Sequence, residues 1–258
     1  MRRQMGCIFS WMGSVVPLYG FKNSTMGLNK AEYYKIGILM VIFVGGIIWA
    51  IRIQTPDPKL PILNPSDLNP AVVADSLEGV GINHVVAPFI LIDQTGTVRT
   101  EADVQGKIRV VNYFFTTCPS ICKDMAHHLR TVQAAYRDNK AVQLLSHTAM
   151  PEYDTPEILA AYAHQNQVNP HRWWLLTGEP EELNRLARTS YFAVLEAGQG
   201  WDEHSFIHTE NLVLVDHKGR LRGYYDGTSE EETSLLIAHI GWLLKERSAD
   251  FIKSSKAK

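Results

Sequence analysis

The sequence has few cysteines, no excess of either charge sign, and no internal repeat or low-complexity tract. Three cysteines in 258 residues are too few for a scaffold held together by disulfides. Lys and Arg number 25 and Asp and Glu 27, so the formal net charge of -2 gives no reason to expect a nucleic-acid partner. The length and a hydrophobic share of 45% are ordinary for a globular chain with one sizeable domain and additional segments.

One long apolar run is present, and it predicts a transmembrane helix. Residues 36–51 carry no charge. Together with Tyr33, Tyr34 and Ile53 they form an apolar window of about 20 residues, which is enough to cross a bilayer. No small-x-small cleavage site follows the run, so we interpret residues 36–53 as an uncleaved anchor and not as a removable signal.

Basic residues are distributed unevenly around this anchor. Those that precede it are Arg2, Arg3, Lys22, Lys30 and Lys35, whereas only Arg52 and Lys59 follow it closely. The positive-inside rule then assigns residues 1–35 to the cytoplasmic side and everything after Arg52 to the outside. We therefore expect a single-pass inner-membrane protein with its functional domain in the periplasm. The alternative location is the mitochondrial inner membrane, with the domain facing the intermembrane space.

The first 25 residues suit a cytoplasmic head poorly. Met26 is followed by a short basic stretch and then by the anchor, which is a more usual beginning. We therefore expect translation to start at Met26, which would leave Cys7 out of the mature protein. The rival interpretation is a mitochondrial presequence, because the head contains arginine and has no acidic residue before Glu32.

Prolines recur after the anchor, at positions 56, 58, 61, 65 and 70. Proline has no backbone N–H to donate to a strand ladder and favours extended backbone, so residues 54–84 are expected to form a semi-rigid spacer. The domain itself is then expected over residues 85–247, and residues 248–258 as a tail.

Within the domain, β-branched and aromatic runs alternate with helical patterns. Strands are expected at residues 89–93, 98–100, 108–115, 141–148, 173–176, 212–216 and 221–225. Helices are expected after Cys122, at Pro156 behind a Thr155 cap, at Pro180, and after Thr228, which with Glu231 resembles a capping box. This alternation predicts an α/β fold with a central sheet and helices on both faces.

The most informative stretch is residues 109–130, RVVNYFFTTCPSICKDMAHHLR. A buried strand ends here in a turn that carries Cys118 and Cys122, and a helix with one apolar face follows at once. Thiols at a helix N-terminus face the positive end of the helix dipole and unpaired N–H groups, which lower the thiol pKa. Because thiolate attacks disulfides and binds soft metals, the position of the two cysteines favours redox or metal chemistry.

Four segments in order resemble the Sco/SenC family. They are the Cys-x-x-x-Cys turn, the helix start Asp154–Glu157, the Leu176–Gly178 sequence ahead of a Glu-rich helix, and His208 before Leu212–Asp216. The resemblance covers roughly Pro88 to Glu246. It implies a membrane-anchored, thioredoxin-like domain, with a central sheet flanked by helices, that serves as a copper chaperone for the binuclear CuA centre of cytochrome c oxidase.

By this resemblance Cys118, Cys122 and His208 bind one copper ion, since two thiolates and an imidazole suit Cu(I) and can hold Cu(II). The implied partners are the CuA-bearing oxidase subunit and a thiol reductant or copper donor protein. The sequence departs from the family pattern with Lys123 where proline usually follows the second cysteine, Met150 where Asp usually precedes Pro, and Ile207 where Asp often precedes the histidine. None of these departures removes an expected ligand.

Other soft or titratable side chains have simpler interpretations. His127 and His128 are expected on a solvated helix face. His147 and Met150 are expected to pack, with a second, transient copper contact as the alternative. For the cysteine pair, the alternative is a structural disulfide that holds the turn.

Three further functions stay open at this point. A thiol–disulfide oxidoreductase would use Cys118 to attack and Cys122 to resolve disulfides of the oxidase subunit or another extracytoplasmic protein. A peroxiredoxin-like peroxidase would require threonine at the position of Phe115, which disfavours that enzyme class. A non-catalytic copper or redox sensor also agrees with the sequence.

Overall fold

The computed structural model of the chain describes residues 29–54, 59–68, 73, 77, 79–119, 121–196, 206–208 and 210–256. The expectations for Cys7 and for a start at Met26 lie outside these described residues. The chain divides into two compact units, Met1–Pro56 and Asp57–Lys258, and each is considered by itself.

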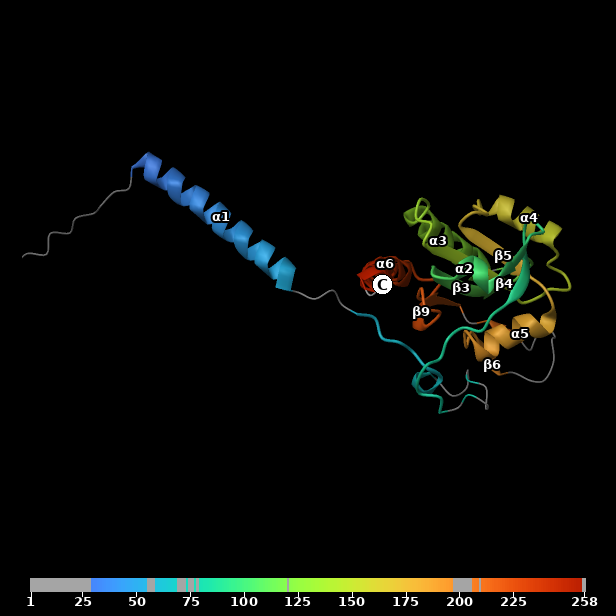
Figure 1. The fold of residues 1–258 in the computed structure, drawn as a ribbon. Helices are drawn as coiled ribbons and strands as arrows, with labels where there is room; N and C mark the ends of the chain where they lie inside the picture. The colour runs from blue at the N-terminus through green and yellow to red at the C-terminus, as the bar shows by residue number, and fades with distance from the viewer. Residues whose placement is uncertain are drawn as a thin grey trace, which may run out of the picture. The chain divides into compact units, whose positions relative to one another are not determined.

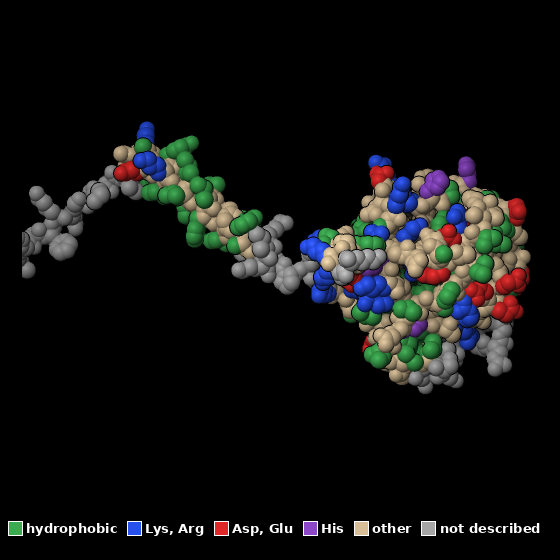
Figure 2. Space-filling view, in the orientation of Figure 1, with side chains coloured by type: hydrophobic (Ala, Val, Ile, Leu, Met, Phe, Trp, Pro, Cys, Tyr) green, Lys and Arg blue, Asp and Glu red, His purple; other side chains and the backbone are tan. Residues whose placement is uncertain are grey.

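The first unit contains the helix α1, Lys30–Gln54, whose apolar side chains are exposed up to Ala50 (Figure 2). It is long and apolar enough to cross a membrane. The helix begins six residues ahead of the predicted anchor because a capping box starts it. The side chain of Asn29 accepts a hydrogen bond from the Glu32 N–H, and the Glu32 carboxylate accepts one from the Asn29 N–H, both at 2.9 Å.

The second unit is built on a seven-stranded sheet in the order β2-β1-β5-β4-β3-β8-β9. Figure 1 labels its strands β3, β4, β5 and β9. The strands are β1 Ile90–Asp93, β2 Val98–Thr100, β3 Ile108–Phe114, β4 Val142–Thr148, β5 Trp173–Thr177, β8 Asn211–Val215 and β9 Leu221–Asp226. The central strands β3, β4 and β5 are parallel and fully buried, as expected of a sheet covered on both faces. A separate antiparallel pair joins β6, Val194–Glu196, to β7, Phe206–His208.

Helices cover both faces of the sheet and enclose two apolar cores. On one face α3 (Ile121–Ala135), α4 (Pro156–Gln165) and α6 (Glu230–Lys256) share a core with Phe114 and the two cysteines. On the other face α5 (Pro180–Thr189) and the short α2 (Glu101–Val104) pack with the segment that precedes β1. The predicted α/β architecture, with a thioredoxin-like sheet flanked by helices, is confirmed.

Several local features differ from the expectation. The four-residue helix α2 and the three-residue strands β6 and β7 are too short for a periodic signal. The helix α6 is capped by Ser229, whose hydroxyl accepts from the Glu232 N–H at 3.2 Å. Thr228 does not cap it, because the Asp226 carboxylate binds both the hydroxyl and the N–H of Thr228. The same helix continues to Lys256, through most of the predicted tail.

Residues of the predicted spacer pack on the domain, and Asp57–Lys258 form one compact unit. Leu63 forms an antiparallel bridge to Leu221, the first residue of β9. Leu63, Leu68 and Leu77 pack on the core under α5. Apolar residues between the prolines therefore give this segment a buried side, which a reading based on proline alone does not anticipate.

A buried arginine holds the segment in place. Arg222 donates to the carbonyl oxygens of Leu60 at 2.7 Å and Pro61 at 2.9 Å. It also forms ion pairs with Asp216 and Glu246, both at 2.9 Å, and its side chain is only 2% exposed. A guanidinium carries enough donors in a fixed fork to satisfy all four groups at once.

Replacement of this arginine should release the segment. For Arg222→Met we expect the free energy of unfolding to fall by about 3 kcal/mol, because two carboxylates and two carbonyls lose a buried partner. Urea unfolding of the chain in detergent, followed by tryptophan fluorescence, measures this. The matched control is Arg137→Met, whose ion pair with Asp138 is exposed on both sides, and whose effect should stay within about 0.5 kcal/mol. Equal losses of unfolding free energy in the two variants would contradict the role given to Arg222 in holding residues 60 and 61.

Candidate thiol and metal site

The thiol turn, which we define as residues 115–119, leads from the end of β3 into α3. The interior strand β3 ends at Phe114 and α3 begins at Ile121. Cys118 lies in the turn and Cys122 in the first turn of the helix, as the sequence predicts. The backbone N–H of Cys118 donates to the carbonyl of Phe115 at 3.3 Å, which closes the turn.

Both cysteines are free thiols and both are buried. Cys118 is 7% exposed and Cys122 2%, and they belong to the core cluster that includes Phe114 and Met125. The pair is therefore shielded from bulk water, and Cys118 is the more accessible of the two. Two buried thiols side by side can bind a thiophilic metal ion, or they can interconvert between the dithiol and the disulfide.

The pKa of Cys122 is raised, whereas the sequence predicts that it is lowered. Burial raises the pKa of Cys122 to about 12, and the neighbouring Cys118 and the charge of Asp154 act in the same direction. A backbone hydrogen bond from Phe115 opposes them only in part. The expected lowering by the helix N-terminus is therefore wrong for Cys122, because desolvation outweighs the dipole. This thiol stays protonated at neutral pH until a metal or a reaction partner displaces the proton.

Hydrogen bonds to Asp154 join the thiol turn to the end of β4. The Asp154 carboxylate is fully buried and accepts from the Thr116 N–H at 3.3 Å, from the Thr116 hydroxyl, and from the hydroxyl of Thr148 at the end of β4. The next residue, Thr155, caps α4 by accepting from the Ile158 N–H, as predicted. The sequence predicts the Thr155 cap. It does not predict that Asp154 holds the thiol turn, because that role depends on hydrogen bonds to Thr116, 38 residues away along the chain.

Two more side chains border the thiols. The Met150 sulfur lies 4.0 Å from the hydroxyl of Thr117, and the side chain is half-buried. The ring of Tyr162, on α4, lies 5.3 Å from that of Phe114. Burial raises the pKa of Tyr162, and the proximity of Cys122 and Cys118 raises it further. A methionine therefore borders the thiol turn, and a neutral phenol lies near the cysteine pair.

His147 does not reach the thiols. Side chains alternate along a strand, and His147 lies on the face of β4 that packs with Tyr113, opposite the face that packs with Phe114 and the cysteines. Its ring stacks on Tyr113 at 5.1 Å and lies near Tyr191 and Phe89. Complete burial lowers the pKa of His147 to about 3. These contacts agree with the packing interpretation.

The two histidines of α3 differ in their exposure to solvent. His127 is exposed and forms a hydrogen bond with Arg130 at 2.9 Å. His128 is half-buried, and its Nδ1 lies 2.8 Å from the carbonyl of Gly227, so it joins α3 to the loop ahead of α6. The expected solvated face fits His127 fully and His128 only in part.

His208 is the last residue of β7, where its backbone pairs with Val194 of β6. The sequence placed it in a loop, and its side chain lies outside the described part of the structure. Among the described side chains, no group of three or more His, Cys, Asp or Glu residues is placed to hold a metal ion. The described portion of the predicted ligand set is therefore the thiol pair, and His208 as third ligand stays a prediction.

Comparison with known proteins agrees with this geometry. The SCO1/SenC family model matches residues 79–245. The SCO1 protein homolog of Bacillus subtilis is 26% identical over 161 residues, which cover 62% of this chain and 82% of that protein. A Stutzerimonas stutzeri protein named "Putative copper-binding protein" is 29% identical over 136 residues, 52% of this chain and 65% of that one.

Among solved structures, that of BsSco superimposes with a TM-score of 0.54 and 25% identity. The match covers 63% of this chain and 94% of BsSco, which is described as having a disulfide switch and as a member of the Sco family of cytochrome c oxidase assembly proteins. The family model covers well over half of this chain, and it includes the thiol turn, Asp154 and β7. The chain therefore belongs to the SCO1/SenC family.

Proposed function

We propose that this chain is a membrane-anchored metallochaperone, which binds one copper ion through Cys118, Cys122 and His208 and delivers it to the CuA site of cytochrome c oxidase. The observation that carries the proposal is the pair of free, buried thiols at the start of α3 in a SCO1/SenC chain. The name of the Stutzerimonas stutzeri relative and the description of BsSco as an oxidase assembly protein support it.

The donor set fits copper as cargo. Thiolate sulfur is a soft ligand that selects Cu(I), and an added imidazole also allows Cu(II) to be held. Copper replaces the thiol protons on binding, and the raised pKa of Cys122 makes that proton release part of the binding equilibrium. The metal would leave by exchange of these ligands for the thiols of the acceptor subunit.

The helix α1 supplies the anchor in this proposal. The balance of basic residues around it favours an N-terminus in the cytoplasm and a domain on the periplasmic side. The proposed partners are the CuA-bearing subunit and a protein that donates copper or reduces the thiols. The boundaries proposed for the chain are a head over residues 1–35, an anchor over 36–53 and a copper domain that ends at 247.

A second candidate function is thiol–disulfide exchange, which the unequal exposure of the two thiols favours. The Cys118 thiolate would attack a partner disulfide, form a mixed disulfide and release the first partner thiol. Cys122 would then lose its proton and break the mixed disulfide, which leaves a Cys118–Cys122 disulfide and the second partner thiol. A thiol reductant is needed to restore the starting dithiol.

Removal of the third ligand tests the copper site. We expect the reduced chain in detergent to bind one Cu(I) in an anaerobic titration, and His208→Ala to bind it at least about tenfold more weakly, since even outer-shell changes cost 10–100-fold. The matched control is His127→Ala, whose exposed ring bonds only to Arg130 among the described residues and should leave affinity unchanged. Unaltered affinity in His208→Ala would place the third ligand elsewhere, with Met150 the next residue to test.

Asp154 is expected to act on affinity by positioning the thiol turn. In Asp154→Asn an amide nitrogen replaces one acceptor oxygen and faces hydroxyl donors, so we expect about tenfold weaker Cu(I) binding and a loss of about 1–3 kcal/mol in stability. Competition with a chromophoric Cu(I) chelator and urea unfolding measure the two effects. Asp138→Asn is the control, because that carboxylate is 91% exposed. Lower stability with unchanged affinity would limit Asp154 to a role in folding.

Trapping of a mixed disulfide separates the two functions. If the chain exchanges disulfides, Cys122→Ser should accumulate an adduct with a disulfide-bridged peptide through Cys118, which intact mass detects. Cys118→Ser should accumulate far less, because the remaining thiol is 2% exposed and has a pKa near 12. If neither variant forms an adduct while the unsubstituted chain binds copper, the oxidoreductase function is excluded.

A further inference from the structure

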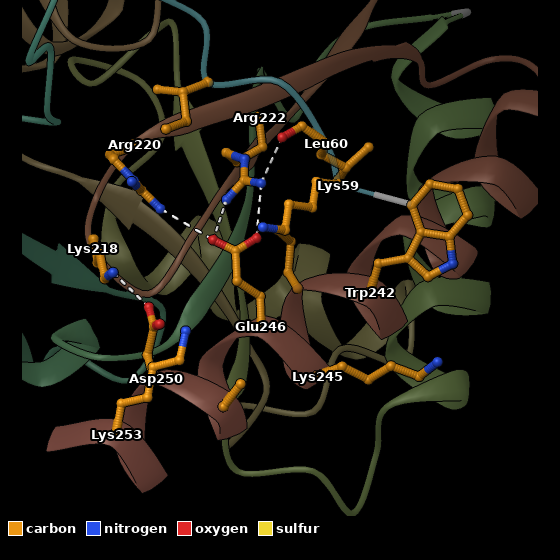
Figure 3. Close-up of a pocket in the computed structure, with 13 residues that line it drawn as sticks. Lys59, Leu60, Lys218, Arg220, Arg222, Trp242, Lys245, Glu246, Asp250 and Lys253 are labelled. Carbon is orange, nitrogen blue, oxygen red and sulfur yellow. Dashed lines mark hydrogen bonds and ion pairs between the residues drawn. The ribbon is translucent and has the colours of Figure 1, made fainter. Parts of the chain in front are cut away.

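A basic cavity of about 370 Å³ lies between residues 59–62, β9 and the C-terminal half of α6 (Figure 3). Its cationic side chains are Lys59, Lys218, Arg220, Arg222, Lys245 and Lys253, and its carboxylates are Glu246 and Asp250. We call the surface formed by these residues the basic face. Figure 2 shows Lys and Arg side chains gathered at the end of the domain where Figure 1 marks the C-terminus.

Only part of this positive charge is neutralised. Arg220 and Arg222 converge on Glu246 and also pair with the buried Asp216, while Lys218 pairs with Asp250 (Figure 3). Lys59 and Lys253 are exposed and make no ion pair within the part of the chain that the structure describes. The surplus positive charge is therefore carried by exposed, unpaired lysines.

Exposed apolar side chains accompany the lysines. Ile62 lines the cavity and is 43% exposed. Phe251 is 53% exposed and borders an adjoining hollow together with Lys218 and Lys253. Lysines interleaved with exposed apolar groups are typical of surfaces that lie in a membrane–water interface.

The covalent chain keeps this face near the end of α1. Arg222 binds the carbonyls of Leu60 and Pro61, so this part of the chain is fixed to the domain. Four residues separate Gln54, the last residue of α1, from Lys59. Whatever their conformation, five steps of at most about 3.6 Å keep Lys59 within about 18 Å of the helix end.

The thiol turn lies at the opposite end of the sheet. Leu221 of β9 pairs with Val215 of β8, which pairs with Arg109 near the start of β3, whereas the thiols follow the end of β3. A strand rises about 3.3 Å per residue, so β3 alone separates the two ends by roughly 20 Å. A partner could approach the thiols while the basic face is occupied.

We propose that the basic face binds the anionic phospholipid headgroups of the bilayer in which α1 is anchored. Headgroup phosphates complement the unpaired lysines, and the anionic surface attracts basic groups within a Debye length. Ile62 and Phe251 enter the interface beside them. The inference rests on the anchoring given under the proposed function, and it adds that the domain is held in one orientation, with the thiol turn directed away from the membrane.

Footprinting of lysines tests this in the full chain. The chain is incorporated into nanodiscs of phosphatidylcholine, with or without phosphatidylglycerol, and labelled with a water-soluble amine reagent. We expect Lys59, Lys245 and Lys253 to react severalfold more slowly when phosphatidylglycerol is present, and high salt to restore the rate. Lys123, an exposed lysine next to the thiols, should react equally in both membranes.

Single substitutions sharpen the test. Lys253→Gln should weaken the protection of Lys59 about fivefold, the factor that one basic residue contributes at an anionic membrane surface. The matched control Lys123→Gln should leave that protection unchanged.

Equal labelling of the basic face in both membranes would overturn the proposal. Protection by inorganic phosphate in phosphatidylcholine discs would also overturn it, in favour of a site for soluble anions. Failure of the chain to enter nanodiscs would instead count against the anchoring itself.

Discussion

The geometry of the thiol turn depends on one buried carboxylate. Asp154 binds the backbone and hydroxyl of Thr116 and the hydroxyl of Thr148, so it joins the ends of two parallel strands at the point where the chain turns into α3. A buried carboxylate is stable only when its oxygens are fully hydrogen-bonded, and here the partners that satisfy it also fix the turn. The position of Cys118 and Cys122 is therefore set from the connection between β4 and α4, outside the Cys-x-x-x-Cys segment itself.

Burial defines the chemistry of these cysteines more than helix position does. The pair lies in an apolar core, so the neutral thiol of Cys122 is favoured over the thiolate. A protonated thiol is a poor nucleophile and is oxidised slowly. A thiophilic metal ion can overcome this penalty because it replaces the proton with a stronger partner. In the proposed function, the same desolvation would therefore slow oxidation of Cys122 and still allow copper to bind.

The sequence was sufficient for the architecture because β-branched runs and helices that begin at a proline are local signals. The junction between a strand and a helix that carries both cysteines was also predicted from a local pattern. The role of Asp154 and the pKa of Cys122 depend on which distant segments pack over the turn, and local patterns carry no such information. The packing of the proline-rich segment is equally invisible to local patterns, because Arg222 and Leu221 hold it from more than 150 residues away.

The hydrogen bonds from Arg222 to the carbonyls of Leu60 and Pro61 also determine where a force on the preceding chain would act on the domain. A pull on residues 60 and 61 reaches the fold at the edge strand β9 and at Glu246 of α6. The load is therefore carried by an ion-pair network at one end of the sheet. The thiol turn, at the other end of β3, lies away from that network.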